Sequence, residues 1–237
     1  MYSRIITLAL MRDVRVYLVT GSNIEKTIEQ CTTELVETVN GTFACSGNAF
    51  YAGTQRVFMN YWEPPSNVLD WLQSELSKSP YTNRTGNHIE RRPGSINFSV
   101  VGRNADMKQR IDYKYYDNVA LERHRIVNRF NEKFPTLSAT VGGDTGIDIG
   151  PKGNDKSQVF KYLSPLLYDS EANGGTTPVI TFIGDRMSPG GNDEPLKTII
   201  EASWPPQYCE CVSVTGLDET YEKLGKLYQA MIYEDRD

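Results

Sequence analysis

The residues best suited to chemistry follow a short apolar run near the end of the chain, Pro178 to Ile183. Asp185 comes just after this run, and a Gly-rich loop then returns Asn192 and a second acid, Asp193. A run of this kind is typical of a buried parallel strand, whose carboxyl end is where open α/β sheets bind ligands. Oxygen ligands on a tight loop suit Mg²⁺. The stretch therefore predicts either a magnesium site or a capped turn in which the acids accept backbone hydrogen bonds.

Cationic side chains elsewhere in the chain favour an anionic ligand. Lys156 opens an expected helix, where the helix dipole disfavours a cation unless an anion also binds; the alternative is an ordinary surface lysine. Arg92, Arg103 and Arg110 can each form paired hydrogen bonds to a phosphate. Residues 79–133 carry 11 Lys and Arg against 6 Asp and Glu, although the net charge of the chain is −5. Since the acidic remainder would repel a nucleic acid, we expect a small phosphorylated ligand instead.

Two hydroxyl side chains, Thr20 and Ser22, stand at the end of another expected strand, Val14 to Thr20. Either hydroxyl could bond to a phosphate oxygen. Either could equally act only in helix capping, because Ser22 or Asn23 would cap the helix whose apolar positions begin at Ile24. The sequence leaves both roles open.

The expected elements form two kinds of pattern. Strand–loop–helix units at both ends of the chain, including a third apolar strand over 211–214 and a helix over about 218–232, predict an α/β core. The middle instead has short, partly alternating strands, interrupted by amphipathic helices near 66–78 and 117–134. These middle strands are expected over residues 56–62, 88–91, 95–101 and 137–141.

The fold class that follows is α/β, a doubly wound Rossmann-like core with an inserted α+β cap domain. We predict that the core comprises residues 1–53 and 153–237 and that the cap comprises residues 54–152. Glycine-rich joints at 142–143 and 150–153 would suit a boundary or hinge.

The composition excludes several classes of protein. Hydrophobic residues make up 39% of the chain and charged residues 23%, which argues against collagen-like, disordered and membrane-embedded chains. No run approaches the roughly 20 apolar residues of a membrane helix, and residues 1–11 lack a signal-peptide cleavage site. Four cysteines do not make a disulfide framework in a chain of 237 residues. We predict a cytoplasmic protein with no membrane partner.

The order of these motifs resembles that of the haloacid dehalogenase superfamily, and the middle segment resembles the cap of the eukaryote-type α-phosphomannomutases. The resemblance extends over residues 14–230. The matching runs are residues 20–22, 89–103, 109–111, 142–143, 147–148, 151–156 and 188–193, with Gly184 and Asp185.

This resemblance implies an enzyme that interconverts mannose 6-phosphate and mannose 1-phosphate with Mg²⁺ and supplies GDP-mannose synthesis. Its partners would be mannose or glucose 1- and 6-phosphates and a bisphosphate activator. It would also form a homodimer through the cap. Trp62, Leu69 and Leu72 would supply the dimer surface, or they would instead belong to the core of the cap.

The resemblance also assigns roles to the substrate-binding side chains. Arg92, Arg103 and Arg110 would hold the phosphate that does not react. Asp148 would bind sugar hydroxyls, and Gly146 stands where the family has a serine that contacts the ligand.

The remaining implied roles concern catalysis. Lys156 would neutralise the reacting phosphoryl group, and the hydroxyls of Thr20 and Ser22 would bond to it. Asp185 would bind the magnesium ion, and Asp193 would support the ion or its waters. The implied magnesium site consists of Asp185, Asp193 and Asn192.

One departure from the family concerns the nucleophile. The superfamily's first motif, Asp-x-Asp-Gly-Thr, supplies the nucleophilic aspartate and the acid–base group, and this chain has only one Asp-x-Asp, Asp235 to Asp237. Residues 1–12 match the helix that follows the first strand. Three interpretations stay open: a shortened record of an active mutase, a phosphosugar- or partner-binding protein without chemistry, or a sugar phosphatase of the same fold.

Overall fold

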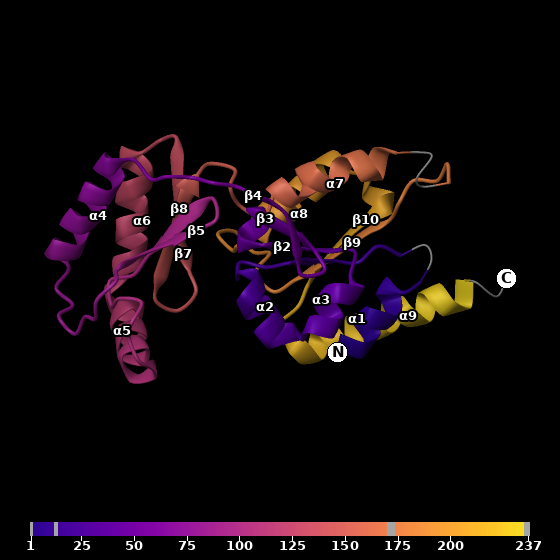
Figure 1. Cartoon of the computed structure of the whole chain (residues 1–237), viewed down its shortest axis with the longest axis horizontal. Helices are drawn as coiled ribbons and strands as arrows, with labels where there is room; N and C mark the ends of the chain where they lie inside the picture. The colour runs from indigo at the N-terminus through magenta and orange to yellow at the C-terminus, as the bar shows by residue number, and fades with distance from the viewer. Residues whose placement is uncertain (1, 12–13, 170–173, 235–237) are drawn as a thin grey trace. The chain divides into compact units, whose positions relative to one another are not determined.

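The computed structural model describes residues 2–11, 14–169 and 174–234 (Figure 1). By its contacts the chain divides into two compact units. The first, here the terminal unit, combines Met1–Met59 with Asp155–Asp237, and the second, the middle unit, is Asn60–Asn154. None of the helices in the described ranges is both long enough and apolar enough to cross a membrane.

The described residues of the terminal unit form two sheets. The first has the order β1 (Tyr17–Val19), β2 (Gly41–Ala44), β3 (Ala49–Ala52) and β4 (Gln55–Met59). In it β1 and β2 are parallel, and β3 and β4 follow as an antiparallel meander. The second sheet pairs β9 (Ile180–Gly184) in parallel with β10 (Cys209–Ser213). The helices of this unit are α1 (Tyr2–Ala9), α2 (Ile24–Cys31), α3 (Thr33–Thr38), α7 (Gln158–Tyr168), α8 (Glu194–Ser203) and α9 (Leu217–Glu234).

Both sheets of the terminal unit contribute to one hydrophobic cluster. Phe43 of β2 is 1% exposed and packs with residues of α7 and α8, and Val19 of β1 and Phe182 of β9 pack against the same cluster. Burying an apolar side chain of this size contributes about 1.5–3 kcal/mol. The two sheets are therefore parts of one α/β core.

Each of the two sheets presents an open strand edge. Val16 O accepts a hydrogen bond from Asn40, and Thr20 N donates to Phe43 O, so alternate residues of β1 bond toward β2. Backbone groups alternate along a strand, so Tyr17 and Val19 face the opposite edge. In β9, Gly184 O accepts a hydrogen bond from Val214 N. By the same alternation, the backbone groups of residues 181 and 183 point away from β10. Neither edge has a strand partner among the described residues.

The middle unit holds a four-stranded antiparallel sheet and three helices. The sheet order is β5 (Ile89–Arg92), β6 (Ser95–Phe98), β8 (Gly146–Pro151) and β7 (Leu137–Gly142). The helices are α4 (Ser66–Lys78), α5 (Met107–Ala120) and α6 (Glu122–Lys133). Figure 1 shows α4 and α6 on one side of this sheet.

The strand register gives this sheet one apolar and one polar face. The apolar face and the helices form a buried cluster that includes Ile96, Phe98, Ile147, Ile149, Val68, Leu72, Tyr113, Ile126 and Phe130. On the other face Glu90, Asn97, Asp148 and Thr140 are direct cross-strand neighbours in one row. Because a row of polar side chains is not needed for packing, this face is a candidate for ligand binding.

The burial of Leu72 shows whether the predicted dimer surface belongs instead to the core of the middle unit. Leu72 is 0% exposed, and Trp62 and Leu69 pack against the same buried cluster. Their role in the core of the middle unit is thereby confirmed.

The single helix predicted near 117–134 is wrong, because α5 ends and α6 begins around Leu121, whose φ is 50°. The carboxylate of Asp117 accepts hydrogen bonds from Arg123 N at 2.9 Å and from Arg123 Nε at 2.7 Å. This buried aspartate satisfies an amide in the first turn of α6, as a capping residue does. A leucine in the left-handed region leaves no signal in the pattern of apolar residues.

Candidate functional site

Thr20 and Ser22 lie in the loop after β1, and this loop is tied to the start of α7. Thr20 Oγ1 accepts a hydrogen bond from Ser22 N at 3.1 Å. Thr20 O accepts from Ser46 N at 2.8 Å, and Ser46 O accepts from Gln158 Nε2 at 2.8 Å. Asn23 caps α2 by accepting from Lys26 N, so the sequence alternative of an Asn23 cap is confirmed.

Lys156 forms a buried ion pair just before α7. Its Nζ lies 2.6 Å from Asp193 Oδ1, and the two side chains are only 7% and 5% exposed. Asp193 Oδ2 accepts a hydrogen bond from Arg186 N at 3.0 Å. The carboxylate therefore has a donor on each oxygen, and its backbone donor, Arg186, directly follows Asp185 in the sequence.

Glycine makes this close approach possible at the end of β9. A Cβ atom on Gly184 would lie 2.7 Å from Asp193 Oδ2, and one on Gly191 would lie 2.0 Å from Arg186 O. Side chains at these positions would push the returning loop away. The Gly-rich sequence of the loop is thus a requirement of the Lys156–Asp193 contact.

Asp185 and Asn192 are exposed at this end of the terminal unit. No hydrogen-bond donor engages the Asp185 carboxylate among the residues with described placement. Mg²⁺ keeps several waters and takes one or two protein carboxylates, so an exposed, unengaged carboxylate fits this ion. Within the described part of the chain no group of three acidic, His or Cys residues gathers around one point.

The polar face of the middle unit carries a ring of charged and amide groups. Arg92 Nη1 lies 3.1 Å from Asp148 Oδ1, and Asn97 Nδ2 donates to the same oxygen at 2.6 Å. Arg103 Nη1 donates to Asn97 Oδ1 at 3.4 Å, and Arg103 and Arg92 both bond to Glu90. The structure thus brings together three of the predicted substrate residues, Arg92, Arg103 and Asp148.

Arg110 lies outside this ring and supports the backbone of Arg103. Its Nη2 donates to the backbone oxygen of Arg103 at 2.9 Å, and its Nε donates to Ala105 O at 2.9 Å. Burial lowers the pKa of Arg103, Glu90 partly opposes that shift, and the nearby charges of Arg92 and Arg110 lower it further. Three guanidinium groups are thus gathered in a small region, as an anion site requires.

Two glycines leave room for the ring. A Cβ atom on Gly146 would lie 2.5 Å from Asn97 Nδ2, and one on Gly142 would lie 2.2 Å from Asp148 Oδ2. A serine at position 146 would require the Asn97 amide to shift. The structure therefore gives Gly146 a steric role beside the predicted substrate residues.

Sequence reasoning missed Glu90, Asn97, Ser46 and Gln158. Glu90 lies on the strand expected over residues 88–91, and Arg92 follows directly after that strand. Two residues apart in an extended segment, they share one face, which could have indicated Glu90. The other three owe their positions to cross-strand register and loop contacts between residues distant in sequence, for which the chain gives no local signal.

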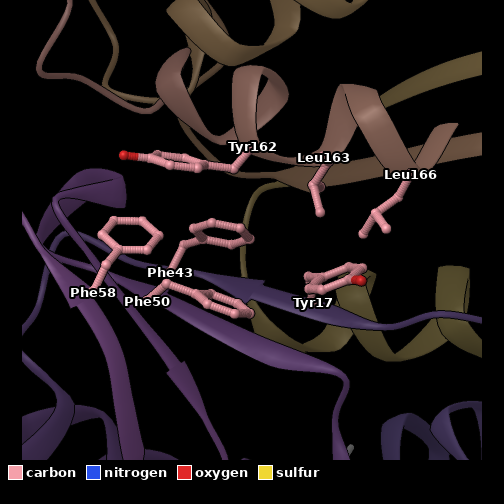
Figure 2. A pocket seen from close by; sticks show the side chains of 7 residues that line it. All are labelled: Tyr17, Phe43, Phe50, Phe58, Tyr162, Leu163 and Leu166. Carbon is pink, nitrogen blue, oxygen red and sulfur yellow. The ribbon is translucent and has the colours of Figure 1, made fainter. Parts of the chain in front are cut away.

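A cavity of about 220 Å³ lies in the terminal unit (Figure 2). It is lined by Tyr17, Phe43, Phe50, Phe58, Tyr162, Leu163 and Leu166. Figure 2 shows Tyr162 lying over Phe58, and the two rings are stacked with centroids 4.3 Å apart. With no charged group in its lining, this cavity does not suit a phosphate ester.

Comparison with known protein families shows which family the chain belongs to. The family model described as eukaryotic phosphomannomutase matches residues 4–227. The chain belongs to this family. Phosphomannomutases of Dendrobium officinale and Saccharomyces cerevisiae are 28% and 29% identical over 198 and 196 residues; these alignments cover 78% and 79% of the chain and 74% of each relative. The Encephalitozoon cuniculi phosphomannomutase is 27% identical over 234 residues, covering 92% of the chain and 82% of the relative.

Solved structures confirm the fold class. A Streptococcus mutans protein has a TM-score of 0.62 at 13% identity, with 96% of this chain and 91% of that chain covered. The N-terminally truncated IMP-nucleotidase of Plasmodium falciparum has a TM-score of 0.59 at 15% identity, with coverage of 94% and 63%. At these identities the likeness concerns the fold alone, the α/β core with an inserted cap.

Proposed function

We propose that this chain binds hexose phosphates and stabilises the phosphoryl transfer that interconverts mannose 6-phosphate and mannose 1-phosphate. The observation that carries the proposal is the buried Lys156–Asp193 pair, whose carboxylate also accepts a hydrogen bond from the backbone N of Arg186, the residue after the exposed Asp185. Phosphoryl transfer depends mainly on positioning and on charge stabilisation. A lysine held by a buried carboxylate is a fixed positive charge of the kind that this reaction uses.

The proposal assigns substrate binding to the polar face of the middle unit, the proposed cap. Arg92 and Arg103, with Arg110 behind them, would bind the non-reacting phosphate through charge-assisted hydrogen bonds. Asp148 would accept hydrogen bonds from sugar hydroxyls, and Gly146 would leave space beside Asn97.

The proposal assigns metal binding and phosphoryl contacts to the terminal unit. Asp185 would hold Mg²⁺, with Asn192 and Asp193 supporting the ion or its waters. The bound ion would neutralise charge on the phosphoryl oxygens. Thr20 and Ser22 would donate hydrogen bonds to the same group, and Asn23 already meets the capping need of α2.

The covalent step needs a carboxylate nucleophile. The one Asp-x-Asp of the sequence, Asp235 to Asp237, lies outside the described residues. A strand with the sequence Asp-x-Asp-Gly-Thr could pair with the open edges of β1 and β9. Because neighbouring parallel strands have their carboxyl ends on the same side of the sheet, its carboxylates would then stand beside Thr20 and Asp185.

The experiment that tests this proposal is a turnover assay on the chain extended at its amino end by a strand and turn ending in Asp-x-Asp-Gly-Thr. We expect mannose 1-phosphate to be converted to the 6-phosphate when Mg²⁺ and a hexose bisphosphate are present. The same extension with its first aspartate changed to asparagine is the matched control and should be inactive. A folded, extended chain that binds the sugar phosphate without converting it would favour the binding-only function, and release of inorganic phosphate would favour a phosphatase.

The remaining parts of the proposal concern context. A hexose bisphosphate would act as activator, and the product would feed GDP-mannose synthesis. We place the protein in the cytoplasm and expect a homodimer through the cap.

A further inference from the structure

We propose that Glu90 is a positioning residue, which holds Arg92 and Arg103 side by side as one phosphate-binding unit. The inference rests on the proposed function and adds a residue to it. Glu90 Oε2 accepts hydrogen bonds from Arg92 Nε at 3.0 Å and from Arg92 Nη2 at 2.8 Å. The same oxygen lies 2.9 Å from Arg103 Nη2. One carboxylate oxygen thus joins two guanidinium groups.

The sheet register fixes where this carboxylate stands. Glu90 is the direct cross-strand neighbour of Asn97, which is in turn the neighbour of Asp148. Arg92 follows two residues after Glu90 and shares its face of the sheet. Three strands therefore hold every member of the ring except Arg103, which lies in the segment between β6 and α5.

Repulsion between the two guanidinium groups gives Glu90 its function. Arg92 and Arg103 are only 26% and 27% exposed, so water screens their charges incompletely. Without an anion between them, the two side chains would separate and regain rotamer freedom. Glu90 removes this tendency before any ligand arrives, which lowers the cost of ordering the arginines on binding.

The contacts with Glu90 do not use up the arginine donors. A guanidinium has five N–H groups. The ring uses three of them on Arg92 and two on Arg103, which leaves two and three for a phosphate. Glu90 can therefore stay in place when the ligand binds.

If Glu90 positions the arginines, removing its charge should weaken phosphate binding, whereas Coulomb attraction alone predicts stronger binding. Glu90→Gln removes a negative charge near a phosphate site, and Coulomb attraction alone would then strengthen binding. Because the arginines lose their organising carboxylate, we expect mannose 1-phosphate to bind about tenfold more weakly instead. The measurement is calorimetric titration of the full chain and its variants.

Glu63→Gln is the matched control. Glu63 belongs to the same unit and forms an exposed ion pair with Arg91, outside the ring. This variant changes the net charge by the same amount and should bind like the parent chain. A second readout follows the Nε–H signals of the arginines by NMR. The Arg92 signal should be protected from exchange with water in the parent and in Glu63→Gln, and unprotected in Glu90→Gln.

The outcomes separate this inference from the proposed function. Unchanged or tighter binding by Glu90→Gln, with a parent chain that binds, would overturn the role of Glu90 alone. Retained protection of Arg92 Nε–H in Glu90→Gln would do the same. A folded parent chain that fails to bind mannose 1-phosphate would overturn the proposed function and this inference with it.

Discussion

Lys156→Met is expected to destabilise the terminal unit by about 3–5 kcal/mol, because it leaves the carboxylate of Asp193 buried without its charged partner. The free energy of unfolding from urea titration, followed by circular dichroism, measures this. In the chain extended with the Asp-x-Asp-Gly-Thr strand, the same variant should also lose at least about a hundredfold in turnover, since a fixed charge facing the phosphoryl group is lost.

Two companion variants make the result specific. Lys161→Met removes an exposed lysine from α7, the helix that follows Lys156, and should change the stability by less than about 0.5 kcal/mol. The double variant Lys156→Met/Asp193→Leu replaces the buried pair by apolar side chains and should recover most of the lost stability, but not the turnover. A single variant as stable as the parent would contradict the buried ion pair.

Asp185→Ala should abolish the response of the protein to Mg²⁺ while leaving its fold intact. The side chain is exposed and accepts no hydrogen bond from the described residues, so its removal should change stability by no more than about 0.5 kcal/mol. We expect the extended chain to lose about a thousandfold in Mg²⁺-dependent turnover, which corresponds to roughly 4 kcal/mol of transition-state stabilisation.

The control for this prediction is Glu222→Ala, which removes an exposed carboxylate from α9. It should keep both the stability and the Mg²⁺ dependence of the parent. Retained, Mg²⁺-dependent turnover in Asp185→Ala would show that the metal is bound elsewhere.

The sequence was sufficient wherever a local pattern fixes the structure. The apolar run before Asp185 does form a strand, β9, and the run before Thr20 forms β1, so both chemical groups stand at the strand ends where they were expected. The fold class is confirmed by the family match and by the solved structures. Short apolar runs flanked by glycine specify a strand and its end with little help from distant contacts.

The rest depends on contacts between distant parts of the chain. From its sequence, the turn containing Asp193 could be a metal site or a capped turn. The structure shows in addition that the Asp193 carboxylate pairs with Lys156, 37 residues away in the sequence. Likewise, Glu90 reaches Arg103 only because the segments on either side of Gly94 pair as neighbouring strands. No local periodicity encodes such pairings, and the break at Leu121 is equally silent in the sequence.

The measurement that tests the central claim most directly is a calorimetric titration of the 237-residue chain with mannose 1-phosphate. Binding needs neither a nucleophile nor turnover, so it tests the phosphosugar site by itself. We predict one site per chain with millimolar or tighter affinity, weakened at least about tenfold in Arg103→Ala because a charge-assisted contact to phosphate is lost. No heat of binding from a chain shown to be folded by circular dichroism and a cooperative melt would contradict the account.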